Sequence, residues 1–284
     1  MKVIKTAVQL RRHISRITTT RKTIGFVPTM GALHDGHLSL IAAARRRCSI
    51  VVISIFVNPT QFGPGEDYRR YPRTLRRDAA LCRRAGAHLL FVPAVKEIYP
   101  TGAAPSVTVG PLGECLEGAS RPGHFNGVAT VVLKLLSLVR PHRLFLGRKD
   151  YQQTLVIKEL IRAFHLGVAV TVCPTVRESD GLAMSSRNRY LTPPQRRAAV
   201  LLHQALQVGL DRLRSGERSA NALRAAMVRV LRQSPLIRLD YLAACNPATL
   251  APLTRVDGRC LLAIAANIGR TRLIDNVMSS KNIA

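Results

Sequence analysis

The first 175 residues alternate between apolar runs and amphipathic segments. The run at residues 49–58 (SIVVISIFVN) contains too many β-branched residues for a comfortable helix, and it predicts a buried parallel strand. We expect strands at residues 23–27, 49–58, 88–93, 106–110, 143–147 and 168–173. Helical patterns lie between most of them, at residues 38–47, 72–85, 128–139 and 150–164. This order predicts an α/β fold, in which helices cover both faces of a parallel sheet.

The pattern changes after residue 175. Residues 174–188 have little periodicity, and a helix is then predicted from Thr192, where Gln195 completes a capping box and Pro193 takes the first helical position. This helix is expected to run to about Arg214, with a second helix at residues 219–232. Strands are predicted at residues 236–244, 259–266 and 272–274. We therefore expect two domains, 1–175 with the parallel sheet and 176–284 as a small α+β domain.

The N-terminal segment has two interpretations. The first 34 residues contain no acidic residue, and arginines stand among serines and threonines, as in an organelle transit peptide. A short amphipathic helix built on Val8, Leu10, Ile14 and Ile17 fits the same residues. The helix is the better interpretation, because a strand already begins near Lys22 and little would remain of the segment after cleavage.

Charge and composition narrow the class of protein. The 284 residues include 43 Lys and Arg against 16 Asp and Glu, a net charge of +27. A balance this basic suggests nucleic acid as a partner, but the arginines are scattered in pairs and triplets, such as residues 45–47, so we do not expect nucleic-acid binding. No apolar run reaches the length of a membrane span, and the most apolar helical pattern contains Lys134. We expect a cytoplasmic protein.

Six cysteines are widely spaced and form no C-x-x-C pair. Zinc and redox motifs are therefore unsupported, and buried free thiols in a reducing compartment are the better interpretation.

Residues 28–37 (PTMGALHDGH) form the strongest candidate for a binding site. They lie between a predicted strand and a predicted helix, so His34 and His37 should stand where the helix begins. N–H groups at a helix N-terminus attract anions, which favours a phosphate contact. Metal ligation and an ordinary surface pair are the alternatives, and the spacing does not match the H-E-x-x-H zinc motif.

Other polar loops follow predicted strands and should reach the same sheet edge. Lys149 can contact phosphate and Asp150 can accept from ribose hydroxyls. A solvated lysine and a helix-capping aspartate are the alternative, and for Asp150 both interpretations can hold. Gln61, Gln153 and Asn58 are uncharged groups that can orient a hydroxy acid, with Met30 and Phe62 as an apolar wall.

Residues 184–187 (MSSR) lie in a loop that follows Gly181. Two hydroxyls and a guanidinium suit a triphosphate. An ordinary polar linker is the simpler interpretation if this loop is read in isolation.

Taken together, these stretches resemble the pantothenate synthetase (pantoate–β-alanine ligase) family of the nucleotidylyltransferase superfamily. The resemblance covers essentially the whole chain, including C-terminal matches at residues 239–241 (LDY), 246–250 (NPATL) and 269–276 (GRTRLIDN). Its most specific matches are PTMGALHDGH, VNPTQF (57–62), RPGHFNGVATVVLKL (121–135), KDYQQ (149–153) and DGLAMSSRN (180–188).

The resemblance implies a Rossmann-like N-terminal domain, a small C-terminal lid domain and a two-step reaction. ATP would activate the pantoate carboxylate as an adenylate, and β-alanine would then displace AMP, with Mg²⁺ bridging phosphate oxygens and no metal ligand assigned to a protein side chain. The resemblance also implies a homodimer formed through the N-terminal domain, with residues 106–110 a candidate contact.

The resemblance also implies roles for individual residues. The catalytic residues would be His34, His37, Lys149, Ser185, Ser186 and Arg187. Pantoate would be held by Met30, Gln61 and Gln153. ATP would be bound by Met30, His37, Gly147, Lys149, Asp150, Val176, Met184, Ser185, Ser186 and Arg187. Asn58 and Tyr71 are weaker assignments.

The sequence departs from the family pattern at three places. Leu146 and Arg148 flank Gly147 where phenylalanine and an acid or glutamine are common. The resemblance implies that Arg148 is an extra cation beside the nucleotide, which either tightens ATP binding or faces solvent. Arg76 and Arg77 precede a lone Asp78 in a helix that is often acidic, which puts a metal role for that cluster in doubt. His88 stands where an acid is usual.

Overall fold

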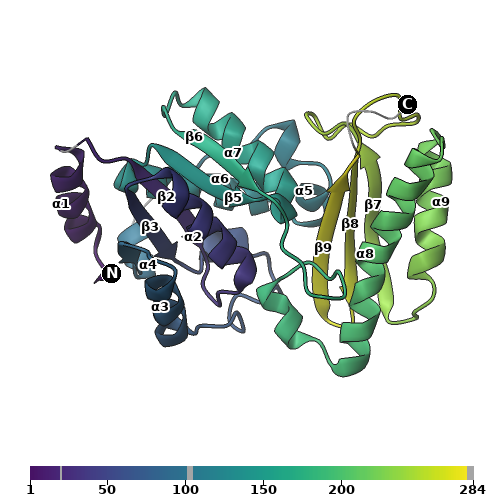
Figure 1. The fold of residues 1–284 in the computed structure, drawn as a ribbon, viewed down its shortest axis with the longest axis horizontal. Helices are drawn as coiled ribbons and strands as arrows, with labels where there is room; N and C mark the ends of the chain where they lie inside the picture. Colours follow the sequence, from purple (N-terminus) through teal and green to yellow (C-terminus); the bar gives the residue numbers. More distant parts are fainter. Residues whose placement is uncertain (20, 101–104, 280–284) are drawn as a thin grey trace. The chain divides into compact units, whose positions relative to one another are not determined.

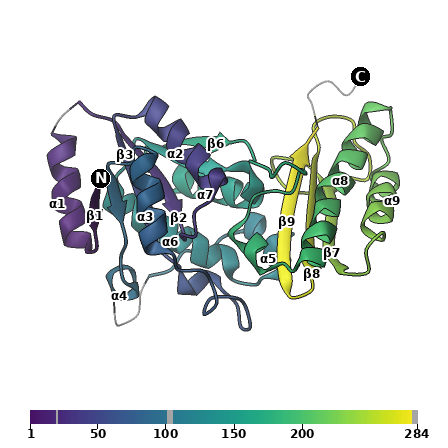
Figure 2. The same cartoon turned by 60° about the horizontal axis from the view of Figure 1, so that its bottom comes forward.

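The computed structural model describes residues 1–19, 21–100 and 105–279, which form two compact units (Figures 1 and 2). The first unit comprises the described residues of Met1–Glu114, Arg121–Arg148 and Gln153–Pro174. The second comprises Cys115–Ser120, Lys149–Gln152 and the described chain from Thr175 onward. Two short segments from the middle of the chain therefore belong to the C-terminal unit, which was not expected from the sequence.

The first unit is built on a six-stranded sheet in the order β1-β4-β3-β2-β5-β6. Every pair of neighbouring strands is parallel. Its strands are β1 (Lys2–Ile4), β2 (Ile24–Thr29), β3 (Ile50–Ile55), β4 (Leu89–Phe91), β5 (Arg143–Gly147) and β6 (Ala169–Cys173). Strand β2 pairs with β3 on one side and with β5 on the other, so the strand order continues in opposite directions from β2. The carboxyl ends of β2 and β5 therefore form a topological switch point, where ligands of such sheets bind.

Helices cover both faces of this sheet, as the sequence predicted. One face is packed by α1 (Ala7–Thr18), α6 (His124–Val139) and α7 (Tyr151–Ala163), and the other by α2 (Asp35–Arg47) and α3 (Leu75–Arg84). Successive residues of a strand point to opposite faces of the sheet. Phe26 packs with α6 in the core on one face, and Val27 packs with α2 in the core on the other. The short helical turns are α4 (Val95–Ile98), η1 (Pro59–Gln61), η2 (Pro111–Gly113) and η3 (Arg148–Asp150).

Several boundaries differ from the prediction. The strand predicted at residues 106–110 is wrong, because the N–H groups of Val107 and Val109 donate to Thr130 Oγ1 and Asn126 Oδ1 of α6 instead of to a neighbouring strand. Strand β1 was missed because three residues leave no readable pattern. Helix α6 begins at His124, four residues before the predicted start, since Gly123 adopts a left-handed φ of +79° just before it.

The second unit packs two helices on an antiparallel sheet in the order β7-β8-β9. Its larger elements are α8 (Pro193–Arg214), α9 (Ala220–Leu231), β7 (Ile237–Cys245), β8 (Leu261–Ile268) and β9 (Thr271–Met278). Leu202, Met227 and Ile264 lie in the core between helices and sheet. The capping box at the start of α8 is present, with Thr192 N–H donating to Gln195 Oε1 at 3.0 Å. Strand β9 is much longer than the predicted 272–274.

Two further observations concern the cysteines and the helices. All six cysteines lie in the described part of the chain as free thiols, and all but Cys115 are buried. No helix within the described ranges is long and apolar enough to cross a membrane.

Candidate functional site

The turn between β2 and α2 is held in an unusual backbone conformation. Gly31 and the non-glycine Ala32 both have left-handed φ angles, +87° and +50°. The carboxylate of Asp78, which is 0% exposed, accepts the N–H groups of Ala32 at 2.9 Å and Leu33 at 3.0 Å, and also the Thr74 hydroxyl. A left-handed alanine is costly unless its surroundings fix it. Asp78 therefore stabilises the turn that places His34 at the N-terminus of α2.

His34 and His37 lie together, as predicted. His34 is the N-cap of α2, and His37 stands in its first turn. Their ring centroids are 4.1 Å apart, and His34 N–H donates to His37 Nδ1 at 3.4 Å. Because a backbone N–H can only donate, the proton of neutral His37 lies on Nε2, which makes that atom a donor. The pair and the helix N-terminus form a site suited to an anion.

Two of the residues predicted to hold pantoate contact each other: Gln61 is the last residue of η1, and Met30 directly follows β2. Gln61 Nε2 contacts Met30 Sδ at 3.1 Å, and Gln61 Oε1 accepts from Asn58 Nδ2 at 3.2 Å. Asn58 is 1% exposed, and its Oδ1 accepts from the Thr60 and Tyr99 hydroxyls. The buried Asn58 side chain thus holds the loop together through its hydrogen bonds. Next to it, the Gln61 amide provides a polar group and the Met30 side chain an apolar one.

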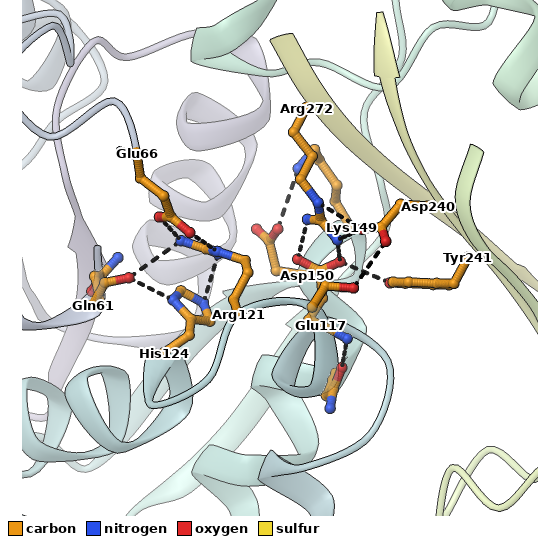
Figure 3. Close-up of polar contacts among 12 residues, drawn as sticks. Gln61, Glu66, Glu117, Arg121, His124, Lys149, Asp150, Asp240, Tyr241 and Arg272 are labelled. Carbon is orange, nitrogen blue, oxygen red and sulfur yellow. Dashed lines mark hydrogen bonds and ion pairs between the residues drawn. The ribbon is translucent and has the colours of Figure 1, made fainter. Parts of the chain in front are cut away.

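Two residues of the RPGHFNG stretch (121–127), Arg121 and His124, contact Gln61 of the same loop (Figure 3). Arg121 makes two hydrogen bonds with Glu66, at 2.7 and 2.6 Å, and both Arg121 and His124 contact the main-chain oxygen of Gln61. Burial raises the pKa of Glu66, but its hydrogen bonds and ion pair with Arg121 outweigh burial, so that the pKa lies below its ordinary value. The sequence showed that this stretch matters, but its contacts with Glu66 and Gln61 were missed.

Two other predicted residues of the first unit stand at element ends. Gly147 is the last residue of β5, and a Cβ added there would meet no atom within 4 Å. Gln153 lies half-buried in the first turn of α7. The position of Gly147 leaves open space at the switch point.

Lys149 and Asp150 belong to the second unit and pair with each other, Nζ to Oδ1 at 3.2 Å. The backbone around them is tied to the C-terminal sheet: Lys149 carbonyl accepts from Asn276 Nδ2 at 2.7 Å, and Tyr151 hydroxyl donates to the Pro247 carbonyl at 2.8 Å. These anchors could not be predicted, because they join residues about a hundred positions apart in the sequence.

A second tie connects the segment Cys115–Ser120 to the same sheet (Figure 3). Glu117 of α5 (Glu117–Ser120) accepts two bonds from Arg272 at 2.7 Å and one from the Tyr241 hydroxyl at 2.9 Å. Arg272 also pairs with Asp240 at 2.6 Å. Burial and the Glu117 carboxylate raise the pKa of Tyr241 well above its ordinary value, so the hydroxyl remains a donor.

Hydrogen bonds and an ion pair hold the loop that contains residues 184–187, which was predicted to bind the triphosphate. Met184 N–H donates to the Val176 carbonyl at 3.0 Å, and Arg177 makes two bonds to Asp275 of β9, at 2.6 and 3.0 Å. Ser185 caps the turn η4 (Ser186–Tyr190), its Oγ accepting from Arg187 N–H. Val176 and Met184, both predicted ATP residues, are therefore neighbours.

Among the residues that the structure describes, no group of three His, Cys, Asp or Glu could hold a metal ion. The oxygens of Asp78 are already occupied by Ala32, Leu33 and Thr74. Mg²⁺ commonly keeps water and takes its remaining ligands from substrate phosphates, which needs no such protein cluster.

Comparison with known proteins places the chain in a family. The family model for pantoate-beta-alanine ligase matches residues 2–278. A pantothenate synthetase of Moorella thermoacetica is 51% identical over 282 residues, which cover 99% of this chain and 100% of that protein. A pantothenate synthetase structure from Thermus thermophilus has a TM-score of 0.93 and 48% identity, covering 98% of this chain and 99% of the other.

A structure of the pantoate-beta-alanine ligase of Francisella tularensis, complexed with beta-gamma ATP and beta-alanine, has a TM-score of 0.82 and 36% identity over the full length of both chains. The sequence match, the length of the aligned region and the shared fold all lead to one assignment. This chain belongs to the pantoate–β-alanine ligase family.

Proposed function

We propose that the protein condenses pantoate with β-alanine, using ATP and producing pantothenate, AMP and pyrophosphate through a pantoyl-adenylate intermediate. The observation that carries the proposal is the turn at residues 30–37, where a histidine pair at a helix N-terminus adjoins the Met30–Gln61 contact. A helix N-terminus, which favours anions, thus adjoins amide and thioether groups suited to a small hydroxy acid.

In the first step, a carboxylate oxygen of pantoate attacks the α-phosphorus of ATP. The bond from that phosphorus to the bridging oxygen of pyrophosphate breaks, and pyrophosphate leaves with the electron pair. His34 and His37 stabilise the charge that develops on the α-phosphate oxygens, together with the N-terminal N–H groups of α2. Phosphoryl-type transfer relies on such positioning and charge stabilisation, and it needs no protein nucleophile.

In the second step, the neutral amine of β-alanine attacks the activated carbonyl carbon. The bond between that carbon and the phosphate oxygen breaks, AMP leaves, and the amine loses a proton to solvent. Gln61 and Gln153 hold the hydroxyls and carboxylate of pantoate, while Met30 supplies the apolar wall. A site that excludes water during these steps protects the acyl adenylate from hydrolysis.

The remaining assignments concern ATP. We propose that Lys149, Ser185, Ser186 and Arg187 bind its phosphates. Gly147, Asp150, Val176 and Met184 are proposed to line the nucleoside. The 3.2 Å pair between Lys149 and Asp150 supports this, because the carboxylate keeps the ammonium oriented before the nucleotide binds. Mg²⁺ held by the ATP phosphates would neutralise charge on the leaving pyrophosphate.

We also propose that residues 1–175 are the ATP- and pantoate-binding domain and residues 176–284 its lid. The homodimer implied by the family resemblance remains a proposal that light scattering on the purified protein tests. Residues 106–110 would enter a dimer contact through side chains, because the N–H groups of Val107 and Val109 are already bonded. Nucleic acid is not proposed as a partner, and the cellular location stays a prediction.

The test is a substrate-omission assay combined with an isotope label. Purified protein is given ATP, Mg²⁺, pantoate and β-alanine together, and then with each one omitted. We expect AMP and pyrophosphate in equal amounts, both requiring pantoate. Pantoate labelled with ¹⁸O in its carboxylate should transfer one labelled oxygen to AMP, because that oxygen forms the bond to phosphorus. Formation of ADP, or of AMP without label, contradicts the mechanism.

A further inference from the structure

The main-chain oxygen of Gln61 accepts hydrogen bonds from two side chains of the RPGHFNG stretch (Figure 3). Arg121 Nη2 donates at 3.2 Å, and His124 Nδ1 lies at 2.8 Å. A carbonyl oxygen has two lone pairs, so these two bonds satisfy it. Gln61 is thus held from α6 and from the residues just before it.

Arg121 is itself fixed in place. Its Nε and Nη2 make the two bonds to Glu66, at 2.7 and 2.6 Å, and its side chain is 12% exposed against 24% for Glu66. Bidentate pairing with a carboxylate leaves a guanidinium little orientational freedom. The remaining nitrogen, Nη1, lies 3.0 Å from His124 Nε2. The guanidinium therefore joins Glu66, His124 and Gln61 in one cluster.

The cluster also determines the proton position on His124. Gln61 oxygen can only accept, so His124 Nδ1 must carry the proton, and Arg121 Nη1 can only donate, so His124 Nε2 must accept. The neutral Nδ1–H form of the imidazole satisfies both contacts. A second proton on Nε2 would turn that acceptor into a donor that faces a guanidinium.

Three further contacts fix the loop around Gln61. Asn58 Nδ2 donates both to Gly127 carbonyl at 3.1 Å and to Gln61 Oε1 at 3.2 Å. Gly127 of α6 approaches so closely that a Cβ added there would lie 2.3 Å from the Thr60 oxygen. The backbone and the side chain of Gln61 are therefore both held by hydrogen bonds from neighbouring side chains.

We propose that Arg121 and His124 are positioning residues that set Gln61 for pantoate binding. The inference rests on the proposed role of Gln61 in holding pantoate. Neither residue is assigned a contact with the substrate: four of the five N–H donors of Arg121 are already directed at Glu66, His124 and Gln61. Their function is to fix where the Gln61 amide stands, since small displacements of such groups weaken binding strongly.

The test measures kcat and the KM of each substrate for Arg121→Lys, His124→Ala and His124→Asn. Lysine removes the bidentate geometry, alanine removes the donor to Gln61, and asparagine restores a donor near the Nδ1 position. We expect the KM for pantoate to rise roughly tenfold to a hundredfold in the first two variants. The KM for ATP should change much less, and His124→Asn should recover part of the pantoate affinity.

The matched control is Arg162→Ala, which removes an exposed arginine paired with Glu159 on α7. It should leave both KM values as in the parent protein. Circular dichroism and thermal unfolding identify variants that fold. A folded His124→Ala variant with an unchanged pantoate KM, or with equal losses for pantoate and ATP, overturns the inference. A parent protein that makes no pantoate-dependent AMP overturns the proposed function instead, so the two failures are distinguishable.

Discussion

The side-chain amide of Asn276 donates to the main-chain oxygen of Lys149 at 2.7 Å, although the residues are 127 positions apart. Asn276 belongs to β9 and is 6% exposed. Because a carbonyl oxygen only accepts, the contacting atom must be the Nδ2 nitrogen. The last strand of the second unit thus fixes the backbone of the lysine that we assign to the ATP phosphates.

Replacing Asn276 with alanine should lower turnover while the protein stays folded. The variant leaves the partly buried Lys149 oxygen without this donor, at a cost of about 1–3 kcal/mol. The lysine would then be less well positioned, and kcat should fall roughly tenfold. Steady-state kinetics and thermal unfolding measure both effects. Asn221→Ala, at an exposed position of α9, is the control and should change neither; an unaltered kcat in Asn276→Ala would show that the contact is irrelevant to catalysis.

Removal of a charge-stabilising side chain should affect turnover much more than stability. In His37→Ala and Lys149→Ala, kcat should decrease by about 10²-fold or more, the usual loss for one donor at a developing charge. AMP formation and urea unfolding are the measurements. Lys158→Ala, an exposed lysine of α7, serves as the control. A His37→Ala protein that fails to fold would identify His37 as a structural residue.

Asp78→Asn should weaken both the fold and the activity. Each Asp78 oxygen accepts a backbone N–H, from Ala32 and Leu33, so an amide nitrogen would place a donor against a donor. We expect a loss of about 1–3 kcal/mol in the free energy of unfolding, with lower kcat because His34 follows this turn. The dependence of activity on Mg²⁺ concentration should not change. Asp211→Asn, in an exposed pair with Arg214, provides the comparison; a shifted Mg²⁺ requirement in Asp78→Asn would favour a metal role instead.

The Glu66–Arg121 pair predicts how stability depends on pH. The pKa of Glu66 in the folded protein lies below its ordinary value of 4.5, so the folded state binds fewer protons than the unfolded state in acid. The pair's contribution is complete above pH 4.5 and is lost as the pH falls through the lower, folded pKa. The stability difference between the parent and Glu66→Gln should therefore shrink in acid. Urea unfolding across the acidic range measures it, and a difference independent of pH would contradict the expectation.

Gly127→Ala should damage the pantoate side of the site. The added Cβ would lie 2.3 Å from the Thr60 oxygen and 2.8 Å from the Gln61 nitrogen, and both are backbone atoms that cannot rotate away. Displacement of η1 should cost about 1–3 kcal/mol of stability, as overpacking generally does. The KM for pantoate should rise more than that for ATP. Gly258→Ala, where a Cβ meets nothing within 4 Å, is the control, and equal behaviour of the two variants would refute the close approach.

The local parts of this structure were readable from the sequence. The β-branched run at 49–58 predicted β3, and the Thr192–Gln195 pattern predicted the start of α8, because strands and caps depend on neighbouring residues. The polar loops after β2 and β5 were predicted to lie close together because the carboxyl ends of parallel strands share one edge. Residues 106–110 show the limit: their alternating pattern suits a strand, but Thr130 and Asn126 take the N–H groups that would form one.

The long-range contacts that position the candidate site residues could not be predicted from local sequence patterns. Asp78 looked like the remainder of an acidic cluster, and only the fold brings it to Ala32 and Leu33. Glu66 and Arg121 are 55 residues apart, and no periodic pattern connects them. Residue types indicate which chemistry is available, while the supporting partners depend on tertiary packing.

The tie between Lys149 and β9 has a consequence for synthesis of the chain. Lys149 leaves the ribosome well before Asn276, and at typical elongation rates the 127 intervening residues take roughly 6–25 seconds. For almost all of that interval neither Asn276 nor Arg272, the partner of Glu117, has been synthesised. The parallel sheet can form first, but the lysine segment must wait for the final strand. A nascent chain therefore acquires its anchored lysine only after Asn276 has been synthesised.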